Sequence, residues 1–146
     1  MDYNALDVSN FIIEKCNELK EPITNLKLQK ILYYVQAYSL VLLDGKMFRE
    51  EIRAWPYGPV VKEVYDEFSH CAASPLSKTD DFEIDDVQER EVICKVFMDK
   101  IFKNVWDLVE QTHKEEPWKL TMEMFGEGAI IPCDVIKKYF EGKVKL

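Results

Sequence analysis

The chain is poor in the features that mark fibrous and membrane-spanning proteins. Its 146 residues include only five glycines and six prolines, which excludes a collagen-like or low-complexity chain. The longest apolar run, residues 31–43, is interrupted by Gln36 and Ser39 and is shorter than the roughly 20 apolar residues that a membrane-spanning helix needs. With 47% apolar residues, the composition instead predicts a globular domain that stays out of the membrane.

Cysteine is also sparse, and its spacing excludes the common metal-binding and redox motifs. The four cysteines are widely separated, and no two of them form a CxxC pair. The first ten residues are acidic and lack the basic start of a signal peptide, so we expect a cytoplasmic protein. Reduced, buried thiols are therefore expected in place of disulfides or zinc. These cysteines are Cys16, Cys71, Cys94 and Cys133.

Basic residues are outnumbered by acidic ones. There are 19 lysines and arginines against 27 aspartates and glutamates, which gives a formal net charge of −8. Such a charge repels phosphate backbones unless a basic patch is segregated on one face, and the densest lysines lie at the C-terminal end, where a solvated helix end accounts for them. We expect no direct nucleic-acid binding, and a basic partner protein suits the charge better.

Motifs that carry catalysis are absent as well. The sequence has no glycine-rich phosphate loop, no GxSxG elbow and no HExxH pair. His70 and His113 are expected at helix ends, where an imidazole can interact with exposed carbonyl groups. Although His70 precedes Cys71, neighbouring helical residues point about 100° apart, so a Cys–His dyad is not expected. No catalytic residue, cofactor or metal site is predicted, and an enzyme of unrecognised class is kept only as a remote alternative.

What the sequence does contain is helical periodicity over most of its length. Apolar residues recur at spacings of three and four in six segments, several of which end at capping residues or prolines. The segments are 5–19, 25–43, 59–70, 85–102, 104–115 and 132–142. We therefore expect a mainly α, compact single domain over residues 1–146, built from about six helices. Residues 50–55 and 81–84 alternate in polarity and allow a short two-stranded β element.

The second of these segments is the most apolar. Thr24 is a good N-cap for it, and only a narrow strip along it is polar or amphipathic. That strip contains Lys27, Lys30, Tyr34 and Tyr38. A helix that is apolar around most of its circumference is normally packed on several sides, so this one is predicted to be the central helix.

Residues 54–61, AWPYGPVV, form an unusual corner with two prolines and a glycine. The pattern suits a type I turn from Trp55 to Gly58, and Pro59 then fits the first position of the third helix. Trp55 is expected to plug the core, and Tyr57 is expected at the exposed tip of the turn. No acid, base or nucleophile lies within the corner, so it is interpreted as a rigid bracket.

Three stretches, taken in order, resemble one protein family. They are TNLKLQKILYYVQAYSL at 24–40, EIRAWPYGPVVKEVYDEF at 51–68 and LVEQTHKEEPW at 108–118. Together they resemble the Panacea domain, also described as the SocA-like or phage-associated GepA-like family. The first and last predicted helices also look like those of that family, so the likeness covers nearly the whole chain.

This resemblance implies an α-helical antitoxin of a type II toxin-antitoxin system. Such domains occur in bacteria, prophages and phages, and they bind and neutralise a protein toxin that is encoded beside them. The family is paired with many unrelated toxins, and many members lack a DNA-binding extension, so none is expected here. One branch implies an alternative role, that of a proteolytic adaptor which delivers its toxin to a AAA+ protease. The oligomeric state is left open.

Residue by residue, the family motif falls on three parts of the chain. Its residues are Leu26, Lys27, Leu28, Gln29, Lys30, Tyr33, Tyr34, Gln36, Trp55, Gly58, Pro59, Val60, Thr112, His113 and Trp118.

Most of these motif residues are expected to be structural. Gln29 and Gln36 can satisfy buried backbone groups of a neighbouring loop, with plain solvation as the alternative for Gln29. His113 is expected to tie Thr112 and Trp118 to another helix. As interface anchors we expect Tyr34, Tyr38 and Tyr57, with a core position as the alternative for each.

Overall fold

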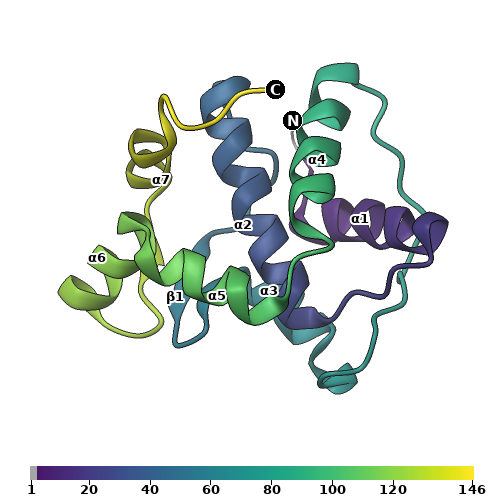
Figure 1. The fold of residues 1–146 in the computed structure, drawn as a ribbon, viewed down its shortest axis with the longest axis horizontal. Coiled ribbons are helices and arrows are strands. Elements are labelled where there is room, and N and C mark those ends of the chain that lie inside the picture. The colour runs from purple at the N-terminus through teal and green to yellow at the C-terminus, as the bar shows by residue number, and fades with distance from the viewer. Residues whose placement is uncertain (1–2) are drawn as a thin grey trace.

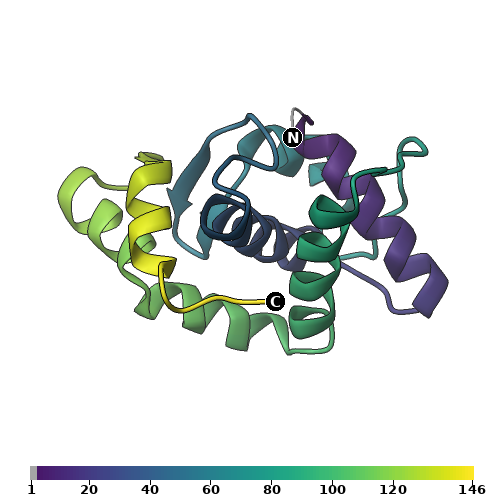
Figure 2. The same ribbon diagram turned by 90° about the horizontal axis from the view of Figure 1, so that it is seen from above.

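One helix, α2 (Asn25–Leu42), runs through the middle of the structure and organises the rest. The computed structural model describes residues 3–146. Seen end-on in Figure 2, α2 is surrounded by the other elements, and it packs against α1, α3, α4, α5, α7 and β2. These surrounding elements are α1 (Ala5–Leu19), β1 (Ile52–Trp55), β2 (Gly58–Val60), α3 (Lys62–Glu67), a 3₁₀ turn (Ser69–Cys71), α4 (Val87–Lys100), α5 (Val105–Lys114), α6 (Glu116–Phe125), β3 (Ile130–Ile131) and α7 (Cys133–Phe140).

The prediction of a mainly α domain around a central helix is confirmed. The Thr24 side chain caps α2 by accepting from the Lys27 N–H, as expected from its N-cap position. The predicted polar strip along α2 is wrong in part, because Lys30 and Tyr34 are both buried. Among the residues that the structure describes, no helix is long and apolar enough to cross a membrane.

The small sheet differs from the predicted β element. Strand β1 lies between β2 and β3, and both pairings are antiparallel. The β1 strand confirms the prediction for residues 50–55, but residues 81–84 form no strand and lie in the loop that precedes α4. Pro59 belongs to β2 and does not begin a helix. Because β2 is an edge strand, it tolerates a residue without an N–H.

A seventh α-helix, α6, was not predicted from the sequence. It follows α5 after a single break at Glu115, whose backbone is extended. Pro117 lies in the first turn of α6, where a proline is well tolerated because the first N–H groups of a helix have no intrahelical acceptor. The fifth predicted helix ends at residue 115 and no helix is predicted for residues 116–125, where Pro117 is the signal that a new helix begins.

The four cysteines are free, as predicted. Cys16 is buried and the other three are partly buried. Burial raises the pKa of the Cys16 thiol to about 12, which keeps it protonated and unreactive.

Two buried glutamines fasten α2 to the chain that follows it. The Gln36 amide donates to the Phe48 carbonyl at 2.8 Å, and its oxygen accepts from the Met47 N–H at 2.8 Å. The Gln29 oxygen accepts from the Val61 N–H at 2.8 Å, and its amide donates to Asn25. Both glutamines therefore satisfy buried backbone groups, and the solvated alternative for Gln29 is excluded.

We expect Gln36→Met to lower the free energy of unfolding by about 2–4 kcal/mol, because buried backbone groups of Met47 and Phe48 lose their partner. Urea denaturation measures this change. Gln88→Met, at an exposed position on α4, is the control and should change stability by less than about 0.5 kcal/mol. Equal stability of the two variants would contradict the assigned role of Gln36.

Candidate functional site

The β1–β2 hairpin is held in place by close contacts with α2 and α5. Gly58 has a φ of +110°, and a Cβ added there would lie 2.7 Å from Thr112 Oγ1 and 2.9 Å from Lys30 Cε. The Lys30 amino group donates to the Pro59 carbonyl at 2.9 Å. The Thr112 hydroxyl donates to the Val109 carbonyl at 2.8 Å. Four motif residues therefore meet in one place, which we call the hairpin lock: Lys30, Gly58, Pro59 and Thr112.

Lys30 is the most unusual member of the lock. Its side chain is 0% exposed, although lysine is seldom fully buried. Burial lowers the pKa of Lys30 to about 7, because the charged form loses its hydration. The long side chain crosses from α2 to the hairpin and supplies a donor to a strand-edge carbonyl.

The corner between α5 and α6 holds the same hairpin from the other side. Trp118 Nε1 donates to the Trp55 carbonyl at 2.8 Å. The His113 ring stacks on Trp118, with 4.0 Å between ring centroids and 19° between planes. This contact joins His113 of α5 to Trp118 of α6 and confirms that part of the expected tie, whereas the part that involves Thr112 stays a prediction. Among the described residues, His113 Nε2 is a buried nitrogen that lacks a hydrogen-bond partner.

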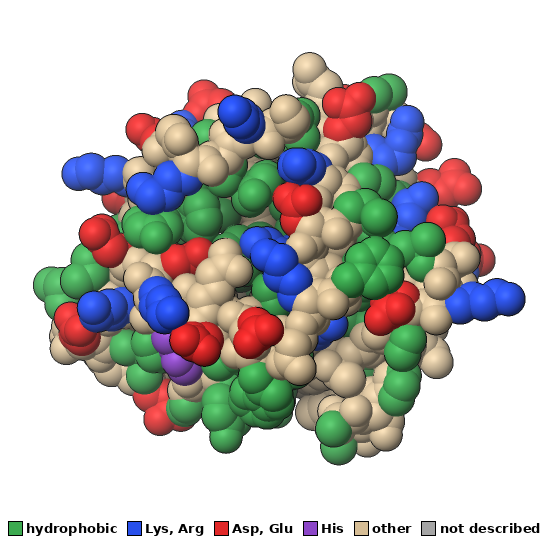
Figure 3. Space-filling model, viewed as in Figure 1, with side chains coloured by type: hydrophobic (Ala, Val, Ile, Leu, Met, Phe, Trp, Pro, Cys, Tyr) green, Lys and Arg blue, Asp and Glu red, His purple; other side chains and the backbone are tan. Residues whose placement is uncertain are grey.

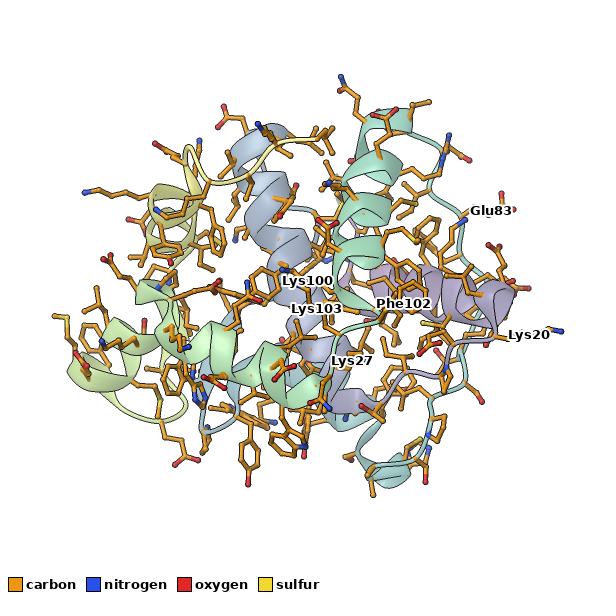
Figure 4. All side chains as sticks on the ribbon, in the orientation of Figure 1. Lys20, Lys27, Glu83, Lys100, Phe102 and Lys103 are labelled. Atoms are coloured by element: carbon orange, nitrogen blue, oxygen red, sulfur yellow. The ribbon has the colours of Figure 1, made fainter. Side chains whose placement is uncertain are left out.

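A buried carboxylate connects the same corner to α2. The hydroxyl groups of Tyr33 and Tyr34 each donate to one oxygen of Glu115 at 3.0 Å. Burial raises the pKa of Glu115, and it also raises the pKa of both tyrosines. Lys100, the last residue of α4 (Figure 4), places its ammonium 4.3 Å from the centre of the Tyr34 ring on α2. The hydroxyl of Tyr34 therefore has a structural role.

On the outside of the hairpin lies an apolar groove of about 460 Å³. Two edge-to-face aromatic pairs form part of its walls, Trp55 with Tyr65 and Tyr57 with Trp106. Hydrophobic side chains gather below α5 on this side of the molecule (Figure 3). The residues that line this aromatic groove are Thr24, Asn25, Leu26, Trp55, Pro56, Tyr57, Val60, Tyr65, Ser69, Ala72, Ala73, Val105 and Trp106.

The three tyrosines that were expected at an interface differ in how far they are exposed to solvent. Tyr57 is 58% exposed at the hairpin turn, in the groove, as its predicted position requires. Tyr34 is buried and cannot present its ring to a partner, because Glu115 and Lys100 occupy its surroundings. Tyr38 is partly buried against the core. Trp55 is also corrected, since it is a half-buried wall of the groove and not a core plug.

Trp106 is the groove residue that the sequence analysis missed. It is 54% exposed, and its ring lies 5.4 Å from that of Tyr57. The helical period gives a mixed signal, because Trp106 lies two positions from the buried Leu108, on the opposite side of the helix, but three positions from the buried Val109, on nearly the same side. A large aromatic residue on the solvent side of a helix marks a surface worth testing.

The expectation for His70 and Cys71 also needs correction. Their side chains approach to 3.5 Å between Nε2 and Sγ, in the exposed 3₁₀ turn beside the groove. The angle between neighbouring side chains does not prevent this contact, because the imidazole is long enough to reach around the turn. Within residues 3–146, no three His, Cys, Asp or Glu side chains converge in a way that could hold a metal ion.

Comparison with known proteins gives two matches. A family model described as "Antitoxin SocA-like, Panacea domain" matches residues 28–119. That range contains the hairpin lock and most of the groove. The curated protein "Antitoxin SocA" of Caulobacter vibrioides (strain NA1000 / CB15N) is 38% identical over 66 residues. The match covers 45% of this chain and 35% of that relative, so it spans about a third of the relative's length. No solved structure matches.

The close approach at Gly58 leads to a stability prediction. Gly58→Ala should lower the free energy of unfolding by more than about 2 kcal/mol, because it combines positive φ with a clash in the lock. Gly128→Ala is the control, since Gly128 also has positive φ but has open space around its Cβ direction. Chemical denaturation should show a clearly larger loss for Gly58→Ala, and equal losses would contradict the lock.

The burial of Lys30 leads to a prediction about pH. The pKa of Lys30 is about 7 in the folded chain and near its ordinary value of 10.5 in the unfolded chain, so unfolding takes up a proton between these values. Stability should therefore rise with pH across this window and fall toward pH 7. The expected slope is up to about 1.4 kcal/mol per pH unit.

Lys30→Met should remove this slope. Urea denaturation at pH 7, 8 and 9 compares wild type with Lys30→Met and with Lys138→Met, which changes an exposed lysine on α7. The difference between wild type and Lys30→Met should grow with pH, while that between wild type and Lys138→Met should stay constant. Parallel curves for all three proteins would exclude a neutral buried Lys30.

Proposed function

Because the chain belongs to the SocA-like Panacea domain family, we propose that it is an antitoxin that neutralises a cognate protein toxin by direct binding. The toxin would be encoded nearby, as in a type II toxin-antitoxin system. The family model, the curated relative and the structure together support this proposal. An antitoxin family suggests a non-enzymatic role, and neutralisation needs no proton-transfer group.

The observation that carries the proposal is the aromatic groove on a rigidly held hairpin. Tyr57 and Trp106 are both more than half exposed, although each has a large apolar ring. Partly exposed tyrosine and tryptophan in a concave site are typical of interface hot spots. The hairpin lock fixes their positions before a partner arrives, which reduces the entropy lost on binding. We place the toxin contact at this groove.

The remaining features of the proposed function follow from the same assignment. Residues 1–146 would act as one Panacea domain in the cytoplasm, without a cofactor and without direct contact to nucleic acid or membrane. The net charge of −8 favours a toxin with a basic surface, because opposite charge accelerates association.

A second apolar surface favours the alternative role of a proteolytic adaptor. Met124 and Phe125 at the end of α6 are 69% and 72% exposed, and Ile130 of β3 is 42% exposed. These residues lie outside the lining of the groove. An adaptor needs one surface for its cargo and another for the AAA+ protease, and the groove and this second surface would provide both.

Expression of the adjacent reading frame tests the proposal. That frame alone should arrest growth, and co-expression of this chain should restore it and yield a purified complex. A harmless adjacent frame, or a toxin that does not co-purify, would remove the main support. The half-life of the toxin separates the two roles, because direct inhibition leaves the toxin abundant whereas an adaptor shortens its half-life. With an adaptor, Phe125→Ala should lengthen the half-life again without weakening toxin binding.

A further inference from the structure

The lining of the aromatic groove offers little to a charged or strongly polar ligand. All of its residues are uncharged, and three of its polar side chains are already hydrogen-bonded within the chain. Thr24 accepts from the Lys27 N–H, Asn25 links Gln29 to the Tyr65 carbonyl, and Ser69 donates to the Asp66 carbonyl. A charged group inserted here would lose its hydration and meet no opposite charge in the lining. The inserted part of any partner is therefore uncharged and mainly apolar.

The backbone beside the groove is also closed to an added strand. Pro59 has no N–H, and its carbonyl accepts from Lys30. The Val61 N–H donates to Gln29, and the Trp55 carbonyl accepts from Trp118. An extended peptide would therefore find these groups already bonded and would leave its own backbone groups unpaired in the groove. A helix satisfies its own backbone, so it is the form of peptide that this groove suits.

The aromatic walls suit the side chains of such a helix. The ring pairs Trp55–Tyr65 and Tyr57–Trp106 have centroid distances of 4.9 Å and 5.4 Å. Each pair holds its two rings edge to face, which gives the groove a defined shape before binding. Its volume of about 460 Å³ lies within the range of roughly 300–1,000 Å³ that is usual for ligand sites.

The two helices that border the groove are both acidic overall. Helix α3 carries three carboxylates against one lysine, and α5 carries two carboxylates against one lysine. On each helix, one carboxylate forms a salt bridge with the lysine of that helix. The lysines do not neutralise the remaining carboxylates of the two helices. None of these carboxylates lines the groove, and Asp107 and Glu110 line a neighbouring pocket, so their negative charge acts at a distance. It favours a partner that carries lysine or arginine outside the residues that enter the groove.

From these observations we propose that the aromatic groove receives a short, basic amphipathic helix of the toxin. Uncharged apolar side chains at positions i, i+3 or i+4, and i+7 enter between the aromatic walls. Lysine and arginine on the flanks of this helix face the acidic α3 and α5. The inference rests on the proposed function, because it names the part of the toxin that the antitoxin binds.

Peptide binding tests the inference directly. Fluorescein-labelled peptides of about 20 residues, tiled along the protein encoded by the adjacent frame, are titrated with the full chain and followed by fluorescence anisotropy. The peptides that bind should have a net positive charge and an apolar face, and they should gain helical circular dichroism on binding. Higher salt should slow their association. Binding by acidic peptides, or by peptides that stay extended, would overturn the inference.

Variants locate the contact on the chain. Trp106→Ala and Tyr57→Ala should each weaken peptide binding more than about tenfold, as expected for hot-spot aromatic residues. Phe125→Ala removes a similarly exposed aromatic residue outside the groove, and it should change binding less than about twofold. Melting temperatures near that of wild type exclude unfolding as the cause. Equal effects of Trp106→Ala and Phe125→Ala would place the contact elsewhere.

The proposed function and this inference can fail separately. If the wild-type chain neither binds nor neutralises the full-length toxin, the proposed function fails and the inference fails with it. If Trp106→Ala and Tyr57→Ala neutralise the toxin as well as wild type does, only the groove assignment fails. Binding of the chain to phosphatidylcholine vesicles through Trp106, without binding to any toxin peptide, would instead assign the groove to a lipid surface.

Discussion

The close contact of Gly58 with Thr112 and Lys30 is the constraint on which the hairpin depends. Strands of three and four residues joined by a two-residue turn are too short to be stable alone, so their position must come from the helices. A side chain at position 58 would push β2 away from α2 and α5. Because two walls of the groove come from the hairpin and another from α5, the shape of the groove depends on this contact.

The buried polar groups give the fold a specific arrangement as well as stability. A buried lysine loses hydration that one hydrogen bond to Pro59 only partly replaces. That bond has a geometric consequence, because it ties the hairpin to one place along α2. Glu115 does the same for α6, since both of its oxygens accept from tyrosines of α2. The two sets of bonds therefore orient the hairpin and the α5–α6 corner relative to the same helix.

The local elements could be predicted from the sequence, whereas the contacts between distant segments could not. Apolar periodicity and a capping residue predict α2, because both signals lie within the helix itself. The burial of Lys30 depends on a carbonyl that lies 29 residues away, so the local pattern assigned this lysine to a solvent-facing strip. Pro59 was misplaced for a similar reason, since a proline at a helix start and one on an edge strand differ only in their tertiary neighbours. The helical period did not decide the exposure of Trp106, which lies between the directions of buried and exposed residues of α5, and it could not predict the pairing of Trp106 with Tyr57.

The positions of the motif residues suggest how one domain type can serve different toxins. The lock residues are buried and cannot contact a partner, so a motif built on them maintains the scaffold. The motif residues that do reach the groove, Leu26, Trp55 and Val60, supply mainly apolar surface. Tyr57 and Trp106 lie outside the motif and are the most exposed aromatic residues of the groove. Under the proposed function, changes at such positions would alter the partner without disturbing the lock, which fits the many unrelated toxins that the resemblance implies for this family.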